Sequence, residues 1–90
     1  MNVQHDPKEQ KFFITVDDGE AVLNYHLKEG VIEFAHTYVP SAYRGKGYAE
    51  AVVKAGFEYA RAKKLKVIPS CPYVPVYLER HPEYQSLTLS

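Results

Sequence analysis

One glycine-rich segment in the middle of the chain limits most strongly what this sequence can fold into. Residues 43–49 read Tyr-Arg-Gly-Lys-Gly-Tyr-Ala, between an extended apolar run at 31–39 and a helical pattern that continues to about Lys64. The first N–H groups of a helix have no intrahelical partner, and the helix dipole is positive at that end. The sequence therefore predicts a strand–turn–helix unit whose turn can bind phosphate.

The residues of this turn suit an anion. Gly45 and Gly47 can adopt positive φ and let the backbone approach a ligand closely, and Arg44 and Lys46 add cationic donors. An ordinary helix-entry turn has the same composition, so the residues alone leave both interpretations open. The nucleotide-triphosphatase loop is excluded, because no Gly-Lys-Ser/Thr ending follows.

Size and composition limit the class of protein. Ninety residues with 46% hydrophobic content predict a single domain over residues 1–90 with a modest core. A formal net charge of zero, from 11 basic and 11 acidic residues, argues against a nucleic-acid partner. No apolar run is long enough to span a membrane. A single cysteine excludes an internal disulfide framework and predicts a cytoplasmic location.

Hydrophobic periodicity predicts an α+β fold. We expect a frayed start at 1–10, a three-strand antiparallel meander at 11–16, 21–28 and 31–39, a helix at 47–63, a strand at 65–68 parallel to the third, and a second helix at 72–81. The third strand is nearly all apolar or aromatic, which predicts that both its faces are covered. Leu23, Tyr25 and Leu27 should point inward, and residues 83–90 could form a short edge segment.

The central helix has a clear apolar stripe. Its members recur at helical spacing: Ala49, Val52, Val53, Gly56, Phe57 and Ala60. A glycine costs a helix up to about 1 kcal/mol relative to alanine. Gly56 within the stripe therefore indicates close packing of this helix against the sheet.

The central segment also resembles a known family. Residues 44–49 are similar to the Arg/Gln-x-x-Gly-x-Gly/Ala signature of the GNAT superfamily of N-acetyltransferases. The segments at 36–40 (His-Thr-Tyr-Val-Pro), 70–73 (Ser-Cys-Pro-Tyr) and 81–84 (His-Pro-Glu-Tyr) resemble the short, single-domain branch of that superfamily. The resemblance covers roughly residues 31–84. It implies a GNAT-like fold and transfer of an acetyl group from acetyl-CoA to an unidentified amine, with no metal.

The resemblance also implies where CoA would bind. The diphosphate would lie on the glycine-rich turn, and the acetyl-pantetheine arm would lie between the third strand and the strand at 65–68. Backbone groups near the end of the third strand would bind the arm, and a backbone N–H there could stabilise the oxyanion. The residues expected to contact CoA are Tyr38, Val39, Arg44, Gly45, Lys46, Gly47, Tyr48, Ala49, Tyr73 and Tyr77.

Two residues are candidates for catalysis. Cys71 lies near the start of the second helix, which favours a thiolate. It could accept the acetyl group, line the thioester pocket, or be a small buried hydrophobe. His36 should share a face with Phe34 and Tyr38, as a proton acceptor or as a hydrogen-bonded core residue. Tyr73 and Tyr77 could protonate the CoA sulfur, line the arm channel, or only pack.

One departure from the family pattern concerns the acceptor. Larger GNAT enzymes carry helices between their first two strands, whereas a turn at residues 17–20 stands here. The acceptor, a small molecule or a protein, would therefore bind an open or partner-supplied site. Two other hypotheses stay open on the sequence: a CoA-binding module with weak catalysis, and a small α+β protein whose basic turn contacts phosphate of RNA. The basic cluster at 61–66 suits a solvated helix end or the CoA adenosine phosphate.

Overall fold

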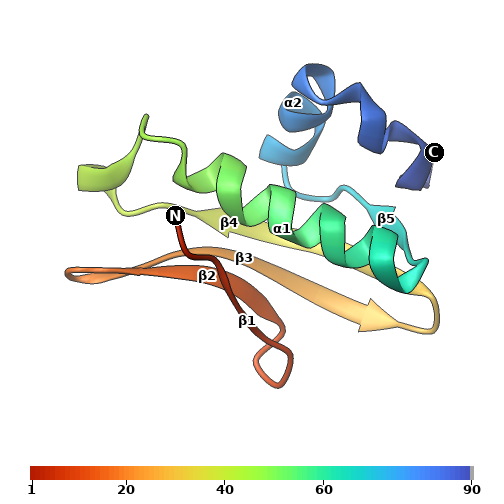
Figure 1. The fold of residues 1–90 in the computed structure, drawn as a ribbon, viewed down its shortest axis with the longest axis horizontal. Helices are drawn as coiled ribbons and strands as arrows, with labels where there is room; N and C mark the ends of the chain where they lie inside the picture. Colours follow the sequence, from red (N-terminus) through yellow and green to blue (C-terminus); the bar gives the residue numbers. More distant parts are fainter. Residues whose placement is uncertain (90) are drawn as a thin grey trace.

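The computed structural model describes residues 1–89 and contains one five-stranded sheet (Figure 1). The strands follow one another in the sheet in chain order: β1 (Gln4–Asp6), β2 (Lys11–Val16), β3 (Gly19–Lys28), β4 (Val31–Tyr38) and β5 (Lys66–Ile68). β1 to β4 pair antiparallel, and β5 pairs parallel to β4. The predicted meander with a parallel fourth partner is confirmed.

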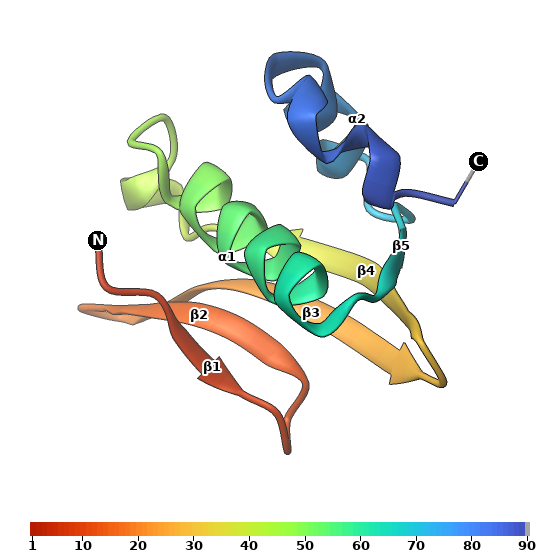
Figure 2. The ribbon, with the colours of Figure 1, turned by 45° about the vertical axis from the view of Figure 1, so that its right-hand side comes forward.

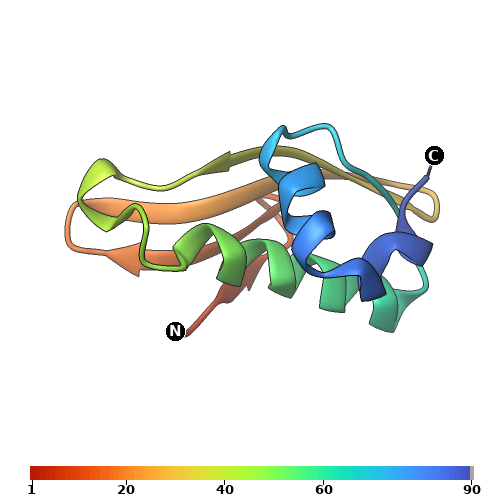
Figure 3. The same cartoon turned by 90° about the horizontal axis from the view of Figure 1, so that it is seen from above.

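The helices lie on one face of the sheet, as Figure 3 shows. A short 3₁₀ helix, η1 (Ser41–Tyr43), leads into α1 (Tyr48–Lys63), which packs across the sheet. α2 (Tyr73–Arg80) and the 3₁₀ helix η2 (Pro82–Leu87) pack against α1 on the side of β5 (Figure 2). Pro75 is tolerated in α2 because it lies in the first turn, where backbone N–H groups have no intrahelical acceptor.

The core forms between the sheet and α1. The predicted helical stripe is buried at Val52, Val53, Gly56, Phe57 and Ala60. Close packing at Gly56 is confirmed, since a Cβ there would lie 2.7 Å from Leu23 Cδ2 and 2.9 Å from Phe34 Cζ. These contacts place α1 nearer to the sheet than a side chain at position 56 would permit.

A β-bulge in β4 changes which residues face the core. The register shifts between Asn24 and Tyr25 of β3, so that Tyr25 pairs with Phe34 and Asn24 pairs with His36. Phe34 faces the core, whereas His36 is exposed on the helix-free face with Tyr38. The prediction that His36 shares a face with Phe34 is wrong, because the extra residue of a bulge reverses the alternation.

The prediction that both faces of β4 are covered is also wrong. The face opposite α1 carries no helix among the described residues (Figure 3), and Tyr38 there is 46% exposed. Antiparallel sheets can leave one face in water. Leu27 was predicted inward and is instead 44% exposed near the end of β3.

The two ends of the chain are more ordered than predicted. The expected fraying is wrong for Gln4–Asp6, which pairs with β2. His5 stacks on Phe12 at 4.1 Å between ring centroids and places Nε2 2.5 Å from Tyr25 Oη, which holds this edge strand in place. At the other end, the edge segment expected within residues 83–90 is limited to a parallel bridge of Thr88 to Val67, because η2 extends to Leu87. Ser90 lies outside the described residues.

Candidate functional site

The glycine-rich turn presents its backbone to solvent. Gly45 and Gly47 have φ of 76° and 88°, in the left-handed region that favours glycine. Gly47 is the N-cap of α1, and no side chain caps the helix there. The N–H groups of the first turn of α1 therefore remain available to an anion. A Cβ at Gly45 would meet no atom within 4 Å, so the space beside the turn is open.

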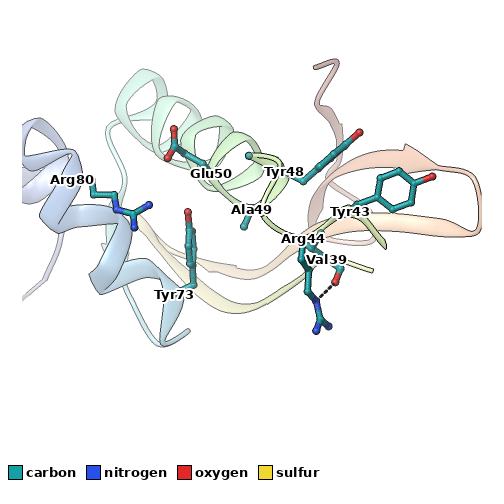
Figure 4. Close-up of a pocket in the computed structure, with 10 residues that line it drawn as sticks. Val39, Tyr43, Arg44, Tyr48, Ala49, Glu50, Tyr73 and Arg80 are labelled. Atoms are coloured by element: carbon teal, nitrogen blue, oxygen red, sulfur yellow. Dashed lines mark hydrogen bonds between the residues drawn. The ribbon is translucent and has the colours of Figure 1, made fainter. Parts of the chain in front are cut away.

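A cavity of about 380 Å³ lies between this turn and α2 (Figure 4). Its lining residues come from the end of β4, the turn, the start of α1 and α2: Val39, Tyr43, Arg44, Gly45, Gly47, Tyr48, Ala49, Glu50, Tyr73 and Arg80. Seven of the ten residues expected to contact CoA line it: Val39, Arg44, Gly45, Gly47, Tyr48, Ala49 and Tyr73. The segments that the sequence associated with CoA thus meet at one site.

Two guanidinium groups lie on different sides of this cavity. Arg44 donates from Nε to the carbonyl oxygen of Val39 at 2.8 Å, which leaves its terminal nitrogens free of that bond (Figure 4). Its guanidinium also lies 5.8 Å from the ring centroid of Tyr38. Arg80 reaches the cavity from α2, and sequence reasoning missed it because no motif marks an exposed arginine near the end of a helix.

The cavity continues toward the middle of β4. A second hollow of about 280 Å³ is lined by Thr37, Tyr38, Val39, Arg44, Ala49 and Tyr73, and four of these residues also line the first. The two hollows therefore form one cleft, which runs from the glycine-rich turn to Thr37. Tyr38, one of the residues expected to contact CoA, lines this second part.

Cys71 lies behind the inner end of the cleft. Its thiol donates to Thr37 Oγ1 at 3.3 Å, and its backbone N–H donates to the carbonyl oxygen of Phe34 at 2.9 Å. The side chain is 5% exposed. The bulge turns Thr37 inward, toward Cys71, and turns His36 away from it. Sequence reasoning missed Thr37, because regular alternation along β4 puts it on the outer face.

The two tyrosines of α2 have different surroundings. Tyr73 lines both parts of the cleft, and burial raises the pKa of its hydroxyl, so it stays protonated. Tyr77 is 1% exposed and packs on Phe57 and His81. Burial also raises the pKa of Tyr77, and its hydroxyl has no hydrogen-bond partner among the described residues. Of the two, Tyr73 has access to a ligand in the cleft.

Three predicted groups lie away from the cleft. Lys46 and Tyr77 are not among its lining residues, and the basic cluster at 61–66 lies at the far end of α1. A helix of 16 residues is about 24 Å long, which separates that cluster from the turn. Arg61 is instead paired with Glu58 at 2.5 Å.

Residues 1–89 contain no group of three or more His, Cys, Asp or Glu side chains that could hold a metal ion. Among the helices of these residues, none is both long and apolar enough to cross a bilayer.

The chain is similar to known proteins over nearly its whole length. The family model of the GCN5-related N-acetyltransferases matches residues 11–87. Proteins named NATD1 from Gallus gallus and Danio rerio are 30% and 31% identical over 90 residues, which cover 97% of this chain and 82% of each relative. The NMR solution structure of a GCN5-like protein from Staphylococcus aureus superposes with a TM-score of 0.77 at 30% identity, and covers 99% of this chain and 88% of that one.

Proposed function

Because the chain belongs to the GCN5-related N-acetyltransferase family, we propose that it transfers the acetyl group of acetyl-CoA to an amine. The observation that carries this proposal is the cleft that joins the uncapped start of α1 to Thr37 on β4. The turn offers backbone amides for a diphosphate, and the rest of the cleft offers a mostly apolar path for a flexible chain.

The charges around the turn suit the diphosphate of CoA. Its oxygens would accept hydrogen bonds from the first N–H groups of α1 and from the free guanidinium nitrogens of Arg44. Arg80 would approach the same anion from α2. Lys46 does not line the cleft, but it is exposed on the turn and adds positive charge beside the anion.

The acetyl-transfer chemistry would take place near Thr37. Bound acetyl-CoA supplies an acetyl group activated as a thioester. Tyr73 lines the cleft and stays protonated, so its hydroxyl can donate a proton to the departing sulfur. His36 is exposed on the opposite face of β4 and can accept the proton of an amine that arrives from that side.

The surroundings of Cys71 favour direct transfer over a covalent intermediate. Reactive thiols are accessible and lie beside cations, whereas this thiol is buried and bonded to a neutral hydroxyl. The bulge also places His36 on the other face, so it cannot serve as the base for Cys71. We assign Cys71 to the packing behind the inner end of the cleft, where its thiol holds Thr37.

Isothermal titration of acetyl-CoA tests this function. The double variant Arg44→Ala, Lys46→Ala should bind acetyl-CoA at least about thirtyfold more weakly, since a hydrogen bond to a charged group contributes about 1.5–3 kcal/mol. The matched variant Lys54→Ala, Lys63→Ala removes two exposed cations from α1 away from the cleft and should bind as the native chain does. Equal affinity of all three chains would contradict the proposed site.

An amine screen then separates transfer from binding alone. Mass spectrometry should detect an acetylated amine that depends on the enzyme and on acetyl-CoA. A chain that binds acetyl-CoA but acetylates no amine would be a CoA-binding module instead.

A further inference from the structure

A third hollow, of about 370 Å³, is separate from the cleft. It shares no residue with the cleft and is lined by His26, Lys28, Glu29, Val31, Glu33 and Ile68. His26 and Lys28 pair across the strands with Glu33 and Val31, so these four side chains share the sheet face opposite α1. We refer to these six residues as the outer groove.

The outer groove combines negative charge with apolar surface. It holds the carboxylates of Glu29 and Glu33 against one ammonium group, that of Lys28, and an imidazole, that of His26. Glu33 is fixed in place because Ser70 Oγ donates to its Oε2 at 2.5 Å. Val31 and Ile68 supply apolar walls, and Ile68 is 37% exposed. A cation on an aliphatic stem complements such a surface.

The outer groove ends where β4 loses its neighbouring strand. The parallel ladder between β4 and β5 ends at the pair Glu33 and Ile68. Beyond that pair the bulge brings His36 onto the same face as Glu33. At about 3.3 Å per strand residue, His36 lies roughly 7–10 Å along β4 from Glu33. The inner end of the cleft, at Thr37, is one residue further.

We propose that the outer groove binds the acceptor and that the acceptor is an aliphatic amine with a second positive charge, such as a diamine or polyamine. Glu33 and Glu29 hold the distal ammonium, and Val31 and Ile68 contact the methylene stem. The other amine then lies beside His36. This inference rests on the proposed function and adds the substrate class to it.

The residues of the cleft and of the outer face of β4 account for every proton in the transfer. The amine nitrogen forms a bond to the acetyl carbonyl carbon, and the carbon–sulfur bond breaks. The amine proton goes to His36, and Tyr73 gives a proton to the departing sulfur, which yields the amide and CoA. Solvent then returns the proton from His36 to Tyr73.

Two amine substrates isolate the effect of the second positive charge on acetylation. 1,5-Diaminopentane and 5-amino-1-pentanol have the same five-carbon stem, but only the diamine has a distal ammonium when one amine reacts. The two equivalent amines of the diamine account for only a factor of about two in kcat/KM. The native chain should show kcat/KM at least about tenfold higher for the diamine, as expected for one ion pair in a partly buried groove. The variant Glu29→Gln, Glu33→Gln should lose this preference and keep its affinity for acetyl-CoA. The control Glu9→Gln, Glu79→Gln changes two exposed carboxylates elsewhere and should keep the preference.

These measurements test acceptor binding in the outer groove separately from the acetyltransferase activity. Acetylation of both probes with equal kcat/KM by the native chain, or an unchanged preference in the groove variant, would overturn the groove while the transferase stands. If no amine is acetylated, the proposed transferase activity is contradicted. Backbone amide chemical shifts then test whether the outer groove binds the diamine. 1,5-Diaminopentane should change the amide chemical shifts of Glu33 and Ile68 in the native chain. Unchanged shifts of these two amides would overturn the proposed groove.

Discussion

At the residue scale, the position of Cys71 determines which of two acetyl-transfer routes the chain can use. The thiol is buried and donates to Thr37, and the candidate base, His36, lies on the opposite face of β4. A nucleophilic thiol needs access to the thioester and a group that removes its proton. Burial removes the access to the thioester, and the bulge removes the base.

We therefore predict that Cys71→Ala lowers kcat by less than about tenfold, because only the packing of Thr37 changes. Its affinity for acetyl-CoA should stay the same, and mass spectrometry of the native chain should find no acetyl group on Cys71. Thr37→Val serves as the matched control, since it removes the same hydrogen bond and keeps the thiol. An acetylated Cys71, together with a loss of about a thousandfold in the alanine variant alone, would restore the covalent route.

At the element scale, the contact of α1 with the sheet depends on one missing side chain. Alanine at position 56 would improve helix propensity by about 1 kcal/mol. Its Cβ would, however, lie 2.7 Å from Leu23 Cδ2 and 2.9 Å from Phe34 Cζ, and both of those residues are fully buried. Packing therefore outweighs propensity at this position.

Gly56→Ala should lower the free energy of unfolding by up to about 2 kcal/mol, the cost of overpacking less the gain in propensity. Urea denaturation followed by circular dichroism measures this difference. Ala62→Gly, at an exposed position of α1, isolates the propensity effect and should cost about 1 kcal/mol. A stabilised Gly56→Ala chain would show that α1 can move away from the sheet without cost.

At the scale of the whole molecule, a hydrogen bond ties the C-terminal 3₁₀ helix to the central helix. Tyr84 of η2 is buried, its hydroxyl donates to Glu58 of α1, and Arg61 lies 5.5 Å from its ring centroid. Burial is the main cause that raises the pKa of Tyr84 to about 12, and the bond to Glu58 adds to it. The folded state therefore favours the protonated hydroxyl.

This pKa predicts how stability depends on alkaline pH. A folded-state pKa above the ordinary value near 10 contributes stability that is fully present below pH 10 and is lost as pH rises to about 12. Urea denaturation across that range should show a fall in the free energy of unfolding, and a smaller fall in Tyr84→Phe. Tyr38→Phe, which removes an exposed hydroxyl, should follow the native curve. A Tyr84→Phe curve parallel to the native one would contradict this assignment.

Local features of the sequence were sufficient to predict most of the helices and strands. The extent of α1, the strand β2 and the turn at Gly45 and Gly47 were predicted correctly, because they follow from helical or alternating periodicity and from the freedom of glycine. The crossover expected of a strand–helix–strand unit correctly predicted the parallel β5. The predicted CoA-contact residues at the turn line a cleft, and their role in binding stays a prediction.

Tertiary contacts decided what the sequence could not show. The bulge in β4 arises from pairing with β3, so no pattern within β4 predicts that Thr37 faces Cys71 and His36 faces solvent. Arg80 reaches the cleft only because α2 packs beside α1, and Gln4–Asp6 is ordered only because β2 offers a free edge. Sequence periodicity carries information about neighbours along the chain, whereas these three features depend on residues that folding alone brings together.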